Sequence, residues 1–153
     1  MQLLNEGSAA PLFEGIDQHD VKIKLSDFKG KKIVLYFYPK DNTPGCTAEA
    51  CSLRDSYDDL QKIGYIIIGV SPDSLKSHKK FADKLALPFS LLADESKKIL
   101  TDYGVWGEKQ MYGKKYMGVI RTTFIIDENG IIDKISAKVD TSKHGKQILD
   151  FNK

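Results

Sequence analysis

Two cysteines five residues apart are the side chains in this sequence with the greatest capacity for chemistry. Cys46 follows Thr43, Pro44 and Gly45, and Cys51 comes later in the same segment. Thr is favoured immediately before a helix and Pro suits the first helical position, so a helix is expected to begin here. Cys46 would then lie in the first turn, beside unpaired backbone N–H groups and the positive end of the helix dipole. Both features favour the thiolate, which is the nucleophilic form of cysteine.

A second interpretation treats Cys46 as a structural residue. It would then be a small side chain on the apolar helix face that also carries Leu53 and Tyr57. The Thr-Pro-Gly sequence ahead of Cys46 favours the reactive thiol, because these residues build a helix start whose backbone is exposed to a ligand.

The spacing of Cys51 limits how the two thiols can meet. Five residues of ideal helix give a rise of ~7.5 Å and a rotation of ~140°, which places the two Cα atoms about 8.7 Å apart. A disulfide needs Cα atoms within about 7 Å, so an intact helix cannot hold the bridge. Either the thiols never pair, or the first turns unwind when they do. Cys51 shares its stripe of the helix with four polar residues: Thr47, Arg54, Asp55 and Asp58. This stripe favours an accessible thiol.

Metal binding is the competing use of cysteine. A structural zinc site needs four ligands, usually built from closely spaced cysteine pairs. Only one such pair exists here, and His19, His78 and His144 stand in distant segments. We therefore expect no metal site. His78 is interpreted as a half-buried helix residue and His144 as a surface residue.

The rest of the chain must supply the elements that position this helix start. Two continuous apolar runs, 33–38 and 65–70, are typical of strands buried on both faces at the centre of a parallel sheet. The helix with both cysteines is expected to continue to Gly64. The other expected elements are strands at 12–16, 21–25 and 89–92, helices at 73–86, 95–103 and 142–151, and a hairpin of 123–126 with 131–135. The polar and aromatic stretch 110–118 is expected to be a loop.

This order of elements predicts an α/β fold, with a mixed central sheet flanked by helices and an N-terminal β-hairpin extension. The thioredoxin fold has this order. The chain of 153 residues matches the length of one domain, so 1–153 are expected to fold as a single unit. With 41% hydrophobic and 29% charged residues, the composition excludes disorder and low complexity.

The net charge and the lack of targeting signals limit the classes of function that we expect for this protein. The net charge of +2 gives no strong field toward nucleic acid or an acidic membrane. The first six residues carry no basic side chain, and no apolar run approaches the ~20 residues of a membrane helix. The expected compartment is the cytoplasm, where a thiol stays reduced unless it cycles.

Residues 39–46 read Pro-x-x-x-Thr-x-x-Cys, which resembles the active-site signature of the peroxiredoxins. The flanking segments resemble the bacterioferritin-comigratory-protein, or peroxiredoxin Q, subfamily of that family. They are 43–51, 70–74, 87–89, 111–118 and 121–127. The resemblance covers nearly the whole chain and implies a thioredoxin-like peroxidase domain that reduces hydroperoxides.

The resemblance also implies roles for single residues. Cys46 would be the peroxidatic cysteine, and Thr43 would place its hydroxyl between the thiolate and the peroxide. Pro39 would shield the pocket from water, and Arg121 would hold the thiolate and polarise the peroxide. These roles agree with the physics, because attack on an O–O bond develops negative charge that fixed donors stabilise. A cation such as Arg121 also favours an ionised thiol by direct attraction.

Cys51 would be the resolving cysteine, which condenses with the sulfenic acid on Cys46 to form a disulfide. The spacing then requires residues 45–54 to unwind on oxidation. Glu49 would support the pocket. The resemblance further implies reduction by a dithiol protein such as thioredoxin, a monomeric enzyme, and a reaction without haem, flavin or metal.

Two other function classes stay open from the residues alone. A thioredoxin-type thiol–disulfide oxidoreductase needs Cys-x-x-Cys at the helix start, and the spacing here differs. It also needs a late cis-proline, and no proline follows Pro88. A partner-binding domain of the same fold has no use for Thr43, Cys46 and Arg121 together.

Overall fold

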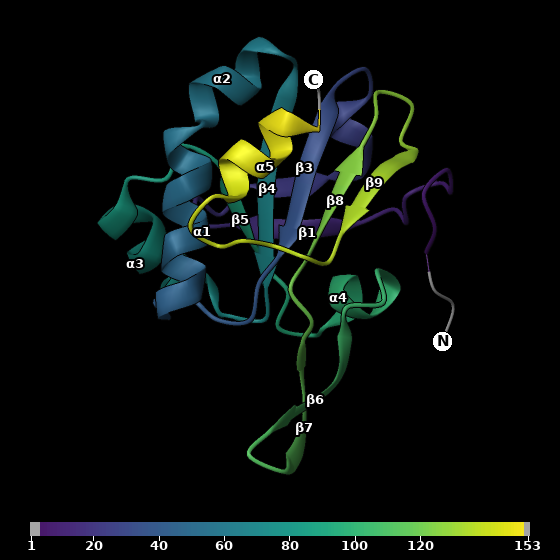
Figure 1. The fold of residues 1–153 in the computed structure, drawn as a ribbon. Coiled ribbons are helices and arrows are strands. Elements are labelled where there is room, and N and C mark those ends of the chain that lie inside the picture. The colour runs from purple at the N-terminus through teal and green to yellow at the C-terminus, as the bar shows by residue number, and fades with distance from the viewer. Residues whose placement is uncertain (1–3, 152–153) are drawn as a thin grey trace.

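The computed structural model describes residues 4–151. Within them, seven strands form one sheet in the order β2-β1-β5-β4-β3-β8-β9, with helices packed on both faces (Figure 1). The strands are β1 Glu14–Asp17, β2 Lys22–Lys24, β3 Lys32–Phe37, β4 Tyr65–Ser71, β5 Ser90–Ala93, β8 Thr122–Ile126 and β9 Ile132–Ser136. The helices are α1 Pro44–Asp55, α2 Tyr57–Lys62, α3 Leu75–Leu85, α4 Lys98–Asp102 and α5 His144–Asp150, with a 3₁₀ turn at Leu25–Phe28.

The centre of the sheet is mixed, as the sequence predicts. β3 pairs in parallel with β4, and β4 pairs in parallel with β5. β8 pairs antiparallel with β3, and β1 antiparallel with β5. The two continuous apolar runs are β3 and β4, and nearly every side chain in them is buried. The architecture confirms the α/β class with a thioredoxin-like arrangement and an N-terminal hairpin of β1 with β2.

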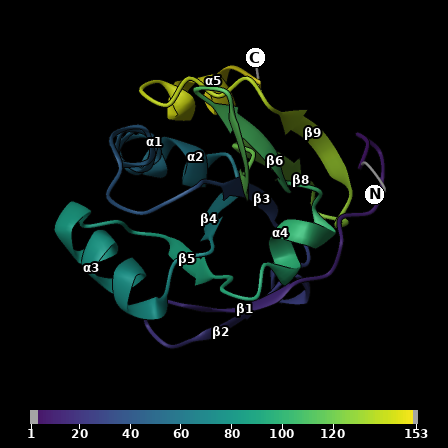
Figure 2. The same ribbon diagram turned by 90° about the horizontal axis from the view of Figure 1, so that it is seen from below.

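Two apolar clusters lie on opposite faces of the sheet. Leu53 of α1, Phe81 of α3 and Ile148 of α5 belong to one cluster, and Leu100 of α4 belongs to the other. Figure 2 shows α1 and α3 on one side of the central strands and α4 on the other. The face covered by α1 is the one that carries Cys46.

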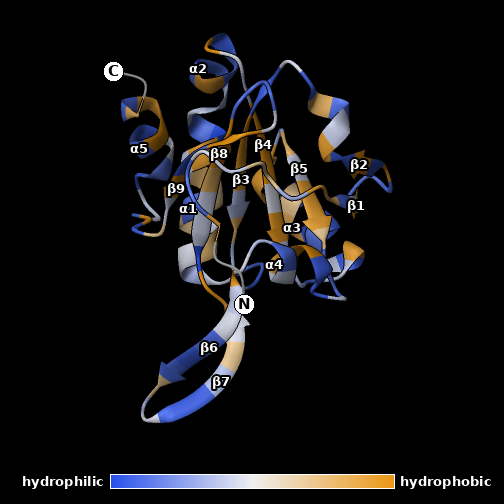
Figure 3. Cartoon of the chain, turned by 90° about the vertical axis from the view of Figure 1, so that its right-hand side faces the viewer, coloured by the Kyte–Doolittle hydropathy of each residue, from blue (hydrophilic) through white to orange (hydrophobic). Residues whose placement is uncertain are grey.

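The structure corrects the expectation of a loop at 110–118. Trp106–Met111 (β6) and Lys114–Val119 (β7) pair as a two-stranded hairpin, which extends away from the sheet (Figure 1). Its turn uses Tyr112 and Gly113, both with positive φ. Figure 3 shows mostly hydrophilic and neutral residues along this hairpin. Because neither face is buried, its strands lack the alternation of apolar and polar residues that predicts a strand.

The expected single helix from Pro44 to Gly64 is interrupted at Ser56, which separates α1 from α2. Leu53 and Leu60 are both fully buried, so the apolar spacing continues across the interruption and conceals it. The first turn of α5 packs here. The Gly145 N–H donates to Ser52 Oγ over 2.9 Å, and a Cβ at Gly145 would overlap Ser56 Oγ. The helices expected at 95–103 and 142–151 are present but shorter at both ends.

The described part of the chain has no helix of the length and hydropathy that crossing a bilayer requires.

Candidate active site

The start of α1 lies at the carboxyl end of β3, as expected. Cys46 occupies the first helical turn and is 2% exposed. Thr43 is the residue immediately before α1, and its backbone is extended. Its side chain makes no capping hydrogen bond to the helix. Its hydroxyl donates to the Lys40 carbonyl over 2.8 Å instead. That bond commits the hydroxyl proton, so the lone pairs of Thr43 Oγ1 are free to accept a hydrogen bond from a ligand.

Arg121 reaches Cys46 from a distant part of the sequence. It immediately precedes β8, whose pairing with β3 puts Thr122 opposite Phe37 at the end of that strand. Arg121 Nη2 donates to Cys46 Sγ over 3.2 Å. Burial disfavours the guanidinium charge, but Glu49 and Cys46 outweigh it and raise the pKa of Arg121. A cation in contact with the sulfur favours its thiolate form.

Glu49 lies one helical turn after Cys46 and is fully buried. Its Oε1 accepts a hydrogen bond from Arg121 Nη1 in a short ion pair. Burial raises the pKa of Glu49 to about 7, against the opposing effect of Arg121. The structure therefore brings together Cys46, Glu49 and Arg121, three of the residues that the family resemblance implies for the site.

Pro39 and Cys51 are the other two residues that the family resemblance implies for the site. Pro39 is partly exposed in the segment between β3 and α1. Cys51 is half-buried in α1, and both cysteines are free thiols. The helix runs unbroken from Pro44 to Asp55, so the two thiols are held apart as the spacing predicts.

His144 is a correction. It was expected on the surface, but its side chain is completely buried at the start of α5. Its Nε2 lies 2.7 Å from Thr123 Oγ1 and 3.8 Å from Glu49 Oε2. Its Nδ1 lies 2.9 Å from Gln147 Oε1. Burial lowers the pKa of His144. The packing of α5 against α1 creates this environment, and no local pattern in the sequence signals it.

His78 is a second correction, because it is fully buried rather than half-buried. Its Nδ1 lies 2.7 Å from Asp41 Oδ2, and its Nε2 lies 2.9 Å from the Leu92 carbonyl. The hydroxyls of Tyr38 and Ser77 donate to the same carboxylate over 2.6 Å and 2.8 Å. Asp41 stands between Pro39 and Thr43 in the sequence, so this network anchors the loop that carries them. No local pattern in the sequence indicates this network, because its members come from segments far apart in the chain.

Asp41, Asp73 and His78 form the one group in residues 4–151 whose spacing could suit a metal ion, with ligand atoms within 4.8 Å of one another. Their atoms are already engaged in hydrogen bonds. Asp73 Oδ2 accepts from the Asp41 N–H over 2.9 Å and from Ser71 Oγ over 2.6 Å. The group is therefore best described as a hydrogen-bonded anchor.

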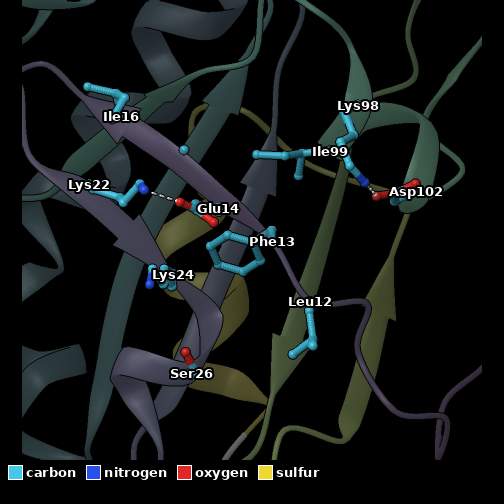
Figure 4. A pocket seen from close by; sticks show the side chains of 11 residues that line it. Leu12, Phe13, Glu14, Ile16, Lys22, Lys24, Ser26, Lys98, Ile99 and Asp102 are labelled. Atoms are coloured by element: carbon cyan, nitrogen blue, oxygen red, sulfur yellow. Dashed lines mark hydrogen bonds and ion pairs between the residues drawn. The ribbon is translucent and has the colours of Figure 1, made fainter.

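A cavity of about 630 Å³ lies elsewhere on the molecule. It is lined by Phe13, which precedes β1, and by residues of β1, β2 and α4, including Ile99. Ion pairs of Glu14 with Lys22 and of Lys98 with Asp102 lie at its wall (Figure 4). None of the residues grouped around Cys46 lines it. The chemistry is concentrated at the start of α1.

Comparisons with known proteins agree with this geometry. Residues 7–135 match the AhpC/TSA family. Peroxiredoxin Bcp of Bacillus subtilis is 49% identical over 143 residues, covering 94% of this chain and 91% of that protein. Peroxiredoxin Bcp of Escherichia coli strain K12 is 42% identical, covering 100% of this chain and 98% of that protein.

Solved structures give the same result. A cysteine-to-serine variant of peroxiredoxin Q from Xylella fastidiosa superposes with a TM-score of 0.93 at 29% identity, covering 99% of this chain and 97% of that one. The bacterioferritin comigratory protein of Xanthomonas campestris has a TM-score of 0.87 at 31% identity, covering 94% and 96%. With the family match over most of its length and these relatives, the chain belongs to the AhpC/TSA family and is a peroxiredoxin of the Bcp, or peroxiredoxin Q, type.

Proposed function

We propose that the protein reduces hydrogen peroxide and organic hydroperoxides, with Cys46 as the attacking thiolate. The observation that carries this proposal is the 3.2 Å contact between Arg121 Nη2 and Cys46 Sγ at the start of a helix. The Xanthomonas campestris relative is described as having alkyl peroxide reduction activity, which supports the same substrate class.

The first step is a two-electron oxidation of sulfur. The Cys46 thiolate attacks one peroxide oxygen, so that an S–O bond forms and the O–O bond breaks. The second oxygen leaves with the electron pair, takes up a proton and departs as water or an alcohol. Arg121 and the free N–H groups of the first helical turn stabilise that negative charge. Thr43 Oγ1 accepts a hydrogen bond from the peroxide, and Pro39 shields the thiolate from water.

The second step joins the two cysteines. The Cys51 thiol attacks the sulfenic acid on Cys46, a disulfide forms and water leaves. Since an intact helix holds the pair too far apart, residues 45–54 must unwind. The docking of Gly145 on Ser52 is lost in that change. A dithiol protein such as thioredoxin then reduces the bridge and restores both thiols.

Hydrogen exchange tests the unwinding. Residues 45–54 should lose amide protection in the oxidised protein, while β3 and β4 keep theirs. Cys51→Ser treated with peroxide is the control, because it cannot form the bridge and should stay protected. Full protection of 45–54 in protein whose bridge is proven by mass would overturn this step.

Peroxide consumption tests the whole cycle. Cys46→Ser should abolish turnover with any reductant. Cys51→Ser should lose turnover with thioredoxin and keep it with a small thiol that reduces the sulfenic acid directly. Equal activity of Cys46→Ser and the unsubstituted protein would contradict the proposal.

We further propose that residues 1–153 act as a single-domain monomer in the cytoplasm. The single domain is supported by the one seven-stranded sheet on which the helices of residues 4–151 pack. The cytoplasm is proposed because a catalytic cycle that returns both cysteines to thiols needs a reducing compartment. Sedimentation of the reduced protein at several concentrations should give one species of 17.2 kDa. A dimer at micromolar concentration would contradict the monomer.

A further inference from the structure

Glu49 carries a buried oxygen whose role the peroxidase steps leave open. Oε1 is used by Arg121, but Oε2 has no hydrogen-bond partner among residues 4–151. The side chain is completely buried, and a polar atom in that position costs free energy unless something satisfies it. His144 lies beside this oxygen, with its Nε2 3.8 Å from Oε2.

The hydrogen bonds of Gln147 fix the tautomer of His144. The Gln147 amide nitrogen donates to the Lys138 carbonyl over 3.2 Å, and its Oε1 accepts from the Asp140 N–H over 3.0 Å. Both backbone partners have a single role, so the amide cannot be flipped. Gln147 Oε1 is thus an acceptor, and His144 Nδ1, 2.9 Å away, must carry the hydrogen.

A neutral His144 consequently presents an unprotonated Nε2 to the site. The one lone pair of that nitrogen can accept either the Thr123 hydroxyl, whose oxygen lies 2.7 Å away, or a proton held on Glu49 Oε2, which lies 3.8 Å away. A lone pair facing a carboxylate is repulsive, whereas one proton placed between the two atoms is shared favourably. A shared proton requires these two atoms to approach from 3.8 Å to hydrogen-bond length while the Thr123 hydroxyl turns away from Nε2.

Four other groups surround the pair formed by Glu49 and His144. Arg121 supplies a positive charge from the segment before β8, and Cys46 supplies a sulfur one turn earlier in α1. From β3, Tyr36 contributes a buried hydroxyl that lacks a hydrogen-bond partner within the described chain. Burial and then Glu49 raise the pKa of Tyr36, so this hydroxyl stays neutral. Asp140 acts on His144 from the loop before α5.

We propose that Glu49 and His144 hold one proton between them, and that this proton determines how much of the Arg121 charge is available to Cys46. His144 is then a positioning residue that acts through Glu49. With the proton present, Glu49 is neutral and the guanidinium is left to the thiolate. Without it, a full carboxylate competes for Arg121 and adds negative charge beside the sulfur. The inference deepens the proposed peroxidase function and rests on it.

Nitrogen NMR of the ring tests the pair directly. Long-range ¹H–¹⁵N spectra of the unsubstituted reduced protein should show the Nδ1–H tautomer for neutral His144. Its signals should move twice with pH, once for its own ionisation and once for that of Glu49. In Glu49→Gln the second movement should vanish. An Nε2–H tautomer, or identical titrations in the two proteins, would overturn the inference.

Alkylation of Cys46 by iodoacetamide, in a Cys51→Ser background, tests the consequence for the thiolate. A thiolate whose proton affinity rises by one pKa unit gains about threefold in nucleophilicity. The alkylation rate should therefore rise about threefold as the pH passes through the ionisation of Glu49. Glu49→Gln should lack this step, and His144→Gln should move it to a different pH. Lys146→Gln, on an exposed residue of the same helix, is the matched control and should keep the step unchanged.

These readouts separate the inference from the proposed function, because neither uses peroxide. The protein could consume peroxide and still show a single inflection of alkylation rate with pH in all four proteins, namely Cys51→Ser alone and combined with Glu49→Gln, His144→Gln or Lys146→Gln. That result would overturn the shared proton alone. A protein that shows the step but fails to consume peroxide would overturn the peroxidase proposal.

Discussion

Arg121 donates a hydrogen bond from Nη2 to Cys46 Sγ over 3.2 Å, although 75 residues separate the two in the sequence. The contact exists because β8 runs antiparallel to β3 and places Thr122 opposite Phe37. The strand pairing brings the Arg121 guanidinium to Cys46 Sγ, and the start of α1 places the same sulfur at the positive end of the helix dipole. Neither local segment could produce that arrangement alone.

Replacing Arg121 by Gln should remove the charge and keep much of the shape. We expect the rate of peroxide reduction to fall by roughly 10²–10³, the usual effect of losing one donor to a developing anion. Stopped-flow kinetics measure this loss. Arg54→Gln, at the other end of α1, is the control, and an equal loss in both variants would contradict the assignment.

Asp41 should prove essential to the loop between β3 and α1. Asp41→Ala leaves His78, Tyr38 and Ser77 without their common acceptor, so the free energy of unfolding should fall by about 3–5 kcal/mol. Asp41→Asn keeps an oxygen for Tyr38 and should cost much less. Urea denaturation measures the difference. Lys84→Ala, which removes an exposed hydrogen bond to the same loop, should cost under about 1 kcal/mol. A cost for Asp41→Ala as small as that of Lys84→Ala would show that the loop does not depend on this carboxylate.

Gly145 should not tolerate a side chain. A Cβ there would come within 2.6 Å of the Ser52 carbonyl oxygen, which is backbone and cannot move aside cheaply. Gly145→Ala should therefore lower the free energy of unfolding by about 1–3 kcal/mol. Thermal unfolding compared with Lys146→Ala on the same helix checks this. Equal stability of the two variants would mean that α5 packs less closely on α1 than the structure shows.

Glu49 should make the protein less stable as pH rises toward neutrality. The pKa of Glu49 is about 7 in the folded protein, because burial raises it from its ordinary value of 4.5. The folded state therefore holds more protons between these values, so the free energy of unfolding falls as pH rises from about 4.5 to 7. The full loss is about 3 kcal/mol. Urea denaturation of the unsubstituted protein and Glu49→Gln at pH 5 and pH 8 measures it. A stability difference between the two proteins that does not change with pH would contradict the raised pKa.

Local patterns predicted the elements that depend on local chemistry. β3 and β4 were identifiable because each is a continuous apolar run, and Cys46 was placed in the first turn because Thr43 and Pro44 favour a helix start. The α/β class followed from the order of these elements.

Features that depend on distant partners could not be read in the same way. The residues next to His144 in the sequence do not indicate its contacts with Thr123 and Glu49. Those next to His78 likewise do not indicate its contact with Asp41. Arg121 entered only through the family resemblance, because its meeting with Cys46 is created by strand pairing.

The central claim is that Cys46 is the thiolate that attacks peroxide. The most direct measurement is a mass spectrum of the protein after one equivalent of hydrogen peroxide, with a sulfenic-acid trap present for Cys51→Ser. We predict a single trap adduct on Cys46 in that variant, and a Cys46–Cys51 bridge with no free thiol in the unsubstituted protein. An adduct absent from Cys46, or both thiols still free after the peroxide is consumed, would contradict the account.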